Sequence, residues 1–118
     1  MNKLKKDEEI KAFLGKGAEF TGTLIFRGSV RIDGDFNGEI IGGKTLVIGE
    51  GAHIEGNIKA DHVLINGNVC GQIDVREKIE IYPPGRVLGY IKTPVLIIKE
   101  GAVFEGNSRM GNENGIKS

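Results

Sequence analysis

Apolar residues occur as pairs two positions apart, and such pairs return at regular intervals along most of the chain. A spacing of two places both members of a pair on the same side of a β-strand, with the residue between them on the other side. Successive pairs begin about 17 residues apart, which predicts a repeated structural unit that opens with a short strand. The pairs are Ala12/Leu14, Val30/Ile32, Leu46/Ile48, Val63/Ile65, Ile79/Ile81 and Leu96/Ile98.

A second motif, of the form apolar-x-Gly-x-apolar, follows each pair and predicts a second strand in each unit. Its central glycine marks a bend, because glycine alone adopts positive φ without strain. The motif reads Phe20-x-Gly22-x-Leu24, Phe36-x-Gly38-x-Ile40, Ile54-x-Gly56-x-Ile58, Val69-x-Gly71-x-Ile73 and Val87-x-Gly89-x-Ile91, and in the last copy Phe104-x-Gly106 is followed by Ser108. We therefore expect structural corners at Gly22, Gly38, Gly56, Gly71, Gly89 and Gly106.

The segment that joins each pair to its glycine motif has two lengths. The longer version carries a glycine close to the second strand, as in Gly17-Ala18 and Gly51-Ala52, and we expect a longer loop there. One longer segment contains Pro83, Pro84 and Gly85, which predicts a rigid turn because proline fixes φ.

One unit cannot bury its apolar side alone, whereas stacked units bury it in columns along a solenoid. We therefore predict an all-β, single-domain parallel β-helix of about six coils over residues 12–108. The apolar spacing departs from the regular hexapeptide repeat of left-handed β-helices, which favours the right-handed form. Residues 1–11 would form an N-terminal tail, a candidate cap or membrane contact, and residues 109–118 a disordered C-terminal tail.

Composition narrows the classes of function. The 16 Lys and Arg balance 16 Asp and Glu, so no net positive field would favour nucleic-acid binding. The longest apolar stretch, 95–98, is far shorter than the ~20 residues of a membrane span. Residues 1–11 lack the apolar segment of an export signal. Together with the single cysteine, these features predict a cytoplasmic protein.

The ends of the predicted solenoid carry large apolar residues. An end coil exposes unpaired backbone groups and the cut edge of the apolar columns unless a polar unit covers it. The flanking segments are mostly polar, so we expect both ends to add further copies of the chain, strand on strand. The predicted polymerisation interface consists of Leu14, Phe20 and Leu24 at one end and Leu96, Ile98 and Phe104 at the other.

The repeat region resembles the bactofilins, bacterial cytoskeletal proteins that include polymer-forming and CcmA-like cell-shape proteins. The resemblance rests on the Gly-rich coils, on LVIGEGAHIEGNIKA (46–60) and IEIYPPGRVLGYIKTPVLIIKEGAVFEG (79–106), and above all on the turn Pro83-Pro84-Gly85-Arg86 with the following Val87-x-Gly89. It implies a right-handed β-helix of triangular cross-section that polymerises end to end into filaments without nucleotide. It further implies filaments at the inner membrane that act as a scaffold for cell-shape or cell-wall enzymes, with a candidate membrane contact at Lys3, Leu4, Lys5 and Lys6.

Residues with catalytic chemistry are few. His53 and His62 are the only imidazoles, alternation turns both outward, and neither lies in a motif with metal-ligand spacing. Cys70 should also face outward at a corner, where a packing role is favoured over that of a reactive surface thiol. The alternative function is a trimeric β-helical acyltransferase, with His53 as general base, or another β-solenoid binding module. We predict instead a structural protein without catalytic site, metal, cofactor or small-molecule substrate, whose main partner is itself.

Overall fold

The computed structural model describes residues 12–110, which form ten β-strands and no helix. The predictions made for residues 1–11 and for 111–118 lie outside this part of the chain. The strands are β1 (Ala12–Leu14), β2 (Glu19–Ile25), β3 (Ser29–Ile32), β4 (Asp35–Ile41), β5 (Thr45–Ile48), β6 (His53–Ile65), β7 (Asn68–Ile81), β8 (Arg86–Thr93), β9 (Leu96–Ile98) and β10 (Val103–Met110).

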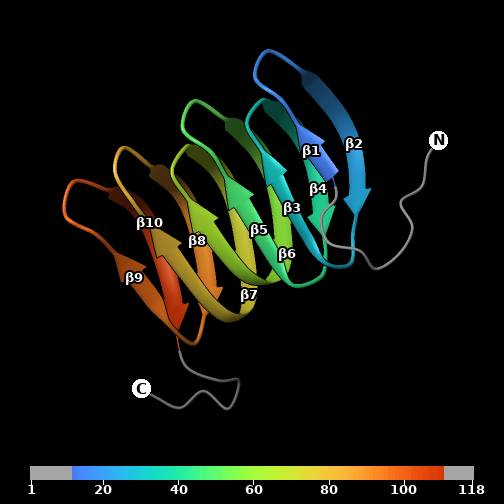
Figure 1. Cartoon of the computed structure of the whole chain (residues 1–118). Helices are drawn as coiled ribbons and strands as arrows, with labels where there is room; N and C mark the ends of the chain where they lie inside the picture. The colour runs from blue at the N-terminus through green and yellow to red at the C-terminus, as the bar shows by residue number, and fades with distance from the viewer. Residues whose placement is uncertain (1–11, 111–118) are drawn as a thin grey trace.

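The strands pair in parallel into two stacks that follow the two sequence motifs (Figure 1). The first stack contains the apolar pairs and runs through β1, β3, β5, the C-terminal parts of β6 and β7, and β9. The second stack contains the glycine motifs and runs through β2, β4, the N-terminal parts of β6 and β7, β8 and β10. Equivalent residues of successive repeats are register partners in both stacks, so the repeat predicted from sequence is the structural repeat.

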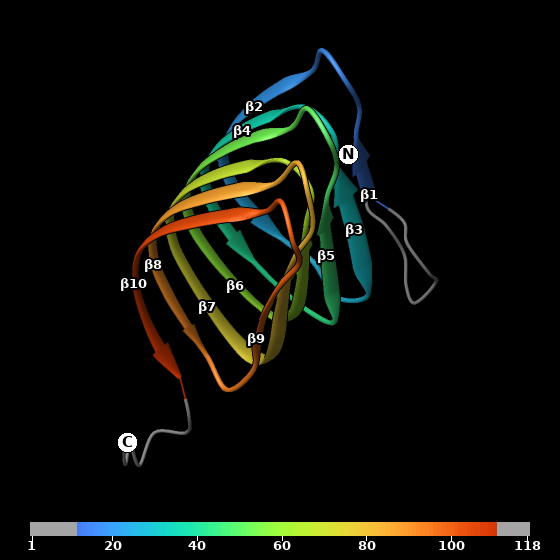
Figure 2. The same cartoon turned by 90° about the vertical axis from the view of Figure 1, so that its left-hand side faces the viewer.

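The solenoid is right-handed and three-sided, as predicted. Figure 2 views it from the end that carries β9 and β10, and there the chain turns counterclockwise as it approaches the viewer. The first stack forms one side, and the strands of the second stack bend across the other two. Six repeat copies enclose about five complete turns, so the predicted count of about six coils is slightly high. Strand β10 continues to Met110, two residues beyond the predicted end of the domain at 108.

Most of the core consists of the inward-facing columns predicted from the two motifs. In the middle coils these side chains are almost completely buried; Leu46, Ile48, Val63 and Ile73, for example, have no exposed surface. Because each column is continuous from coil to coil, one apolar core runs along the solenoid.

The glycine column forms one corner of every coil. Its members have φ between 134° and 144°, a region that side-chain-bearing residues rarely occupy. From Gly38 onward, a Cβ would also overlap the carbonyl oxygen of the column's preceding glycine, so close strand stacking requires glycine here. The column consists of Gly22, Gly38, Gly56, Gly71, Gly89 and Gly106, the six positions at which corners were expected.

The longer linkers form turns at the opposite corner. In each, a backbone N–H donates to the carbonyl three residues before it, as from Ala52 to Gly49 at 3.1 Å. In the turn with Pro83 and Pro84, the N–H of Gly85 donates to the carbonyl of Tyr82 at 2.7 Å. The predicted difference in loop length thus corresponds to the presence or absence of a turn.

Candidate assembly ends

The N-terminal end is formed by β1 and β2. Within residues 12–110, β1 pairs only with β3 and β2 only with β4, so the outer edge of each has no strand partner there. Phe20 stacks on Phe36 of the next coil, with ring centroids 5.0 Å apart and an interplanar angle of 12°, yet it remains 38% exposed. Leu14 and Leu24 pack against the core at the same end and are only partly buried. Among the described residues, this end therefore has an apolar surface that no further strand covers.

The C-terminal end is formed by β9 and β10. In the described part of the chain, β9 is paired only with β7, and β10 only with β8. Leu96 and Phe104 pack against the core but are partly buried, while Ile98 is 43% exposed. The six predicted interface residues thus lie at the two ends, three at each. Their role in polymerisation stays a prediction.

Large exposed hydrophobic residues concentrate at the same two ends. Only Ile41 and Leu88 of this set lie in coils with a further coil on each side. The others belong to the first or last coil; they are Phe20, Ile25, Val95, Ile98 and Met110.

One inward column was missed in the sequence analysis. It lies two residues after the glycine motif and contains Phe26, Gly42, Ala60, Val75, Thr93 and Met110. Ala60, Val75 and Thr93 are buried, and a Cβ on Gly42 would overlap the ring of Phe26. The spacing of two was a usable signal, but the varied residue types hid it. Through Phe26 and Met110 this column adds an apolar residue to each end.

The first stack carries a polar cluster on its outer face. The hydroxyl of Tyr82 donates to Glu80 Oε1 at 2.6 Å, and Glu80 Oε2 lies 3.0 Å from His62 Nε2 and 3.5 Å from Lys78 Nζ. The Tyr82 hydrogen bond and, after it, these other partners hold the pKa of Glu80 below its usual value. The same hydrogen bond raises the pKa of Tyr82. The Glu80 side chain is only 13% exposed, so a charged group lies flat within this face.

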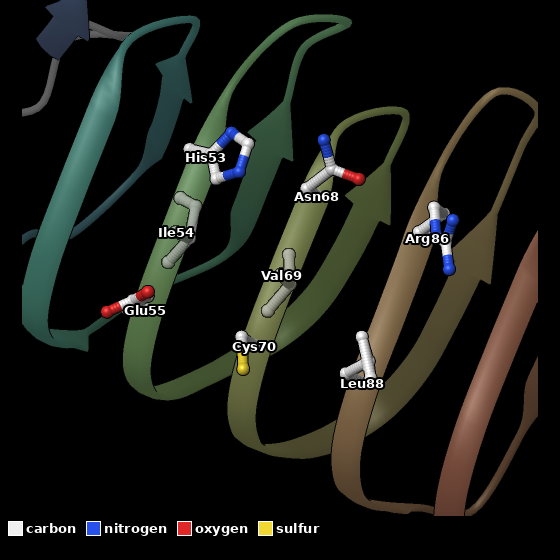
Figure 3. A pocket seen from close by; sticks show the side chains of 8 residues that line it. All are labelled: His53, Ile54, Glu55, Asn68, Val69, Cys70, Arg86 and Leu88. Atoms are coloured by element: carbon white, nitrogen blue, oxygen red, sulfur yellow. The ribbon is translucent and has the colours of Figure 1, made fainter.

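The second stack has a shallow surface depression across β6, β7 and β8 (Figure 3). His53 and Cys70 project outward there, as predicted, and Cys70 is an exposed free thiol. Across residues 12–110 no three His, Cys, Asp or Glu side chains gather closely enough to hold a metal ion. The depression is lined by His53, Ile54, Glu55, Asn68, Val69, Cys70, Arg86 and Leu88.

The described residues contain no helix of the length and apolar character needed to cross a membrane.

A family model described as bactofilin, polymer-forming cytoskeletal, matches residues 12–109, which include both stacks of strands and both ends. The chain belongs to the bactofilin family. Bactofilins are a structural, cytoskeletal family, and the resemblance noted in the sequence is thereby confirmed.

Two curated bactofilins of Myxococcus xanthus are similar in sequence. BacP is 28% identical over 99 residues, which are 84% of this chain and 41% of BacP. BacO is 35% identical over 79 residues, which are 67% of this chain and 63% of BacO. The chain therefore spans less than two thirds of the length of either relative.

Two solved bactofilin structures share the fold. One is a cryo-EM reconstruction of Thermus thermophilus bactofilin double helical filaments, with a TM-score of 0.81 and 33% identity over 86% of this chain and 100% of that one. The other is the solid-state NMR structure of the cytoskeletal bactofilin BacA, with a TM-score of 0.77 and 29% identity over 86% of this chain and 98% of that one. The first is described as a filament, and the second as cytoskeletal.

Proposed function

We propose that this chain is a structural protein whose copies join end to end, without nucleotide, into cytoskeletal filaments. The observation that carries the proposal is the state of the two ends, where strand edges are open and Phe20, Ile98 and Phe104 are only partly covered. A second copy would supply the neighbouring coil that each end lacks. If like ends meet, every contact is isologous, and two such contacts alternate along an open filament.

The proposal extends to the pairing of two filaments side by side. The filaments of the T. thermophilus relative, which has 33% identity and the same fold, are described as double helical. A double helix requires lateral contact between the two filaments that form it.

The experiment that tests end-to-end assembly is the substitution Phe104→Arg. A guanidinium at the joint would lose hydration without a partner, and such burial opposes association strongly. The variant should sediment as a small species while its circular dichroism stays β-rich. Leu88→Arg is the matched control, because Leu88 is 40% exposed on the outward side of β8, one coil in from β10, so this variant should still form filaments. Filaments of Phe104→Arg would show that Phe104 is not at the joint.

We further propose that the filaments act at the cytoplasmic membrane as a scaffold for cell-shape or cell-wall enzymes. The support is family membership together with the basic residues Lys3, Lys5 and Lys6 beside Leu4. Deleting residues 1–11 should abolish co-sedimentation with liposomes that contain anionic lipid and leave filaments intact. Unchanged co-sedimentation would remove these residues from the membrane contact.

The alternative is a trimeric β-helical acyltransferase or another binding module. Negative-stain microscopy of the purified protein without nucleotide separates the two functions, because filaments support the scaffold and compact trimers support the alternative. Membership of a structural family favours the scaffold.

A further inference from the structure

One outer side of the solenoid differs from the other two in its chemistry. We call the outward surface of the first stack the first face; its central row consists of Arg31, Val47, Leu64, Glu80 and Ile97, one from each successive coil. Val47 and Leu64 are register partners and only partly exposed, and Ile97 is also partly exposed. Three of these five residues are therefore apolar, and they form a stripe parallel to the solenoid axis that Glu80 interrupts between Leu64 and Ile97.

Several charged groups of the first face lie beside a partner of opposite charge, and Lys99 Nζ lies over the Tyr82 ring, 5.8 Å from its centroid. Arg31 Nε lies 2.9 Å from Asp33 Oδ2, and this hydrogen-bonded pair raises the pKa of Arg31. Glu80, between Leu64 and Ile97, is held by the Tyr82 hydroxyl, by His62 and by Lys78. Surfaces that become buried in protein–protein contacts avoid isolated charges at their centre and favour apolar and aromatic groups. The first face has this composition.

The outward rows of the second stack are more strongly charged. One row begins with Glu19 and Asp35 at the N-terminal end, and another contains Lys59, Lys92 and Arg109 towards the C-terminal end. All five of these residues are exposed. Burying these rows against another copy would remove several charges from water, which costs free energy unless each gains a partner.

The size of the first face indicates whether it can bind a partner between single molecules or only between filaments. Six stacked strands at ~4.8 Å and about five residues across at ~3.3 Å give a surface of roughly 25 by 15 Å. That area is less than half of the ~800 Å² that each partner buries in a stable dimer. Single molecules would therefore not pair through it. In a filament the same face recurs in every copy, and many weak contacts act together.

We infer that the first face is the lateral surface on which a second filament of this same chain packs. The inference rests on the end-to-end, paired filaments proposed above and adds the surface that joins the two filaments of a pair. The stripe of Val47, Leu64 and Ile97 supplies the contact, and the partners of Glu80 and Arg31 allow these two charged groups to lose water without being left isolated.

The test compares the same type of substitution on two sides of the solenoid. Leu64→Asp places a charge in the stripe, and we expect filaments whose mass per unit length is half that of the wild type. Leu88→Asp makes the same change on the outer face of the second stack and should leave paired filaments unchanged. Mass per length by scanning transmission electron microscopy, or strand counting by cryo-EM, provides the measurement.

Cross-linking gives a second readout that does not depend on tolerance of a new charge. In a Cys70→Ser background, Val47→Cys filaments treated with a short bis-maleimide should yield covalent dimers. Wild-type filaments, whose only cysteine is Cys70 on the second stack, serve as the control and should remain monomeric on a denaturing gel. The variant Val47→Cys with Phe104→Arg should not cross-link, because unassembled copies lack the repeated contact.

The outcomes separate this inference from the proposed function. Wild-type protein that forms only single filaments overturns the lateral surface and leaves end-to-end assembly intact, whereas compact particles overturn both. Splitting by Leu88→Asp but not by Leu64→Asp, or cross-linking of wild-type filaments but not of the Val47→Cys variant, would assign pairing to another side. Loss of liposome binding by Leu64→Asp with paired filaments retained would assign the first face to the membrane and overturn the inference.

Discussion

The middle and end coils contain similar residues at equivalent positions but bury them to very different extents. In one column Ile48 has no exposed surface, whereas Ile98 is 43% exposed; in another Phe36 is 3% exposed and Phe20 is 38% exposed. The side chains of each pair are identical, so the difference arises from the number of neighbouring coils. In a solenoid, burial is supplied by the coils above and below. An end coil therefore carries the same apolar surface with half of its cover missing.

This comparison explains why one sequence pattern can serve both folding and assembly. An apolar column needs no special residue at the end of the solenoid to bind another copy, because its last side chain stays partly exposed where the stack of coils ends. Polar capping units are the usual protection of solenoid ends, and the described first and last coils instead keep Phe20 and Phe104 in the column pattern.

The largest expected effect on stability compares a middle and an end member of the glycine column, Gly56 and Gly22. A Cβ at Gly56 would overlap the backbone of Gly38, and its φ of 135° already disfavours a side chain. At Gly22 the φ of 142° is similar, but a Cβ would meet only the Phe20 ring, at 3.4 Å. We expect Gly56→Ala to lower the free energy of unfolding by at least about 4 kcal/mol, and Gly22→Ala by about 1–3 kcal/mol.

Urea denaturation followed by circular dichroism measures both glycine variants under identical conditions. The matched pair separates steric overlap with the neighbouring coil from the cost of the backbone conformation alone. Equal destabilisation by the two variants would show that the conformation accounts for the whole effect and that coil stacking adds nothing.

A smaller effect is expected in the isoleucine column. Ile48→Ala creates a cavity in a sealed part of the core and should cost about 2–5 kcal/mol of stability. Ile98→Ala removes a side chain that is already 43% exposed and should cost roughly 1 kcal/mol or less in the unassembled chain. Unfolding measured in the Phe104→Arg background keeps assembly out of the comparison.

Assembly should reverse the order of these two isoleucine variants. If Ile98 lies at the joint, Ile98→Ala raises the concentration at which filaments sediment, while a folded Ile48→Ala keeps the wild-type value. A critical concentration that moves only with Ile48→Ala would contradict the proposal that the exposed end columns form the joint.

Much of the fold could be predicted because the same structural constraint recurs in each copy of the sequence repeat. The pair at Val63 and Ile65 and the corner at Gly71 each have equivalents in the neighbouring coils, and their register follows directly from the alignment of the copies. The column with Phe26 and Gly42 was missed, since one copy fills a shared space with a ring where the next has no side chain. Such compensation between coils becomes visible only in three dimensions.

The candidate ends were predictable for the same reason, whereas the first face was not. Phe104 and Leu14 follow from the column pattern and from the position of the last and first copies. The low exposure of Glu80 depends on Tyr82, two residues away, and on His62 in the preceding coil. Alternation places Glu80 outward, but it does not show that its charge is covered by neighbouring polar groups.

The smallest expected effect concerns the Glu80 carboxylate, a charged group in the middle coils that neighbouring side chains mostly cover. Its pKa in the folded protein is lowered, chiefly by the Tyr82 hydrogen bond, from a reference value of 4.5. Between the folded pKa and about 4.5 the unfolded chain binds more protons, so stability rises with pH in this range. The contribution is therefore fully present above the unfolded pKa and is lost as pH falls through the folded one.

Replacing Glu80 with Gln should make the free energy of unfolding fall less steeply on acidification below about pH 4.5. Tyr82→Phe should have an intermediate slope, because it removes the largest of the interactions and leaves His62 and Lys78 in place. Urea unfolding at a series of pH values measures all three proteins. Coincident slopes for the wild type and Glu80→Gln would mean that this carboxylate is not stabilised by the coils around it. The contrast between covered and uncovered coils would then apply to apolar side chains alone.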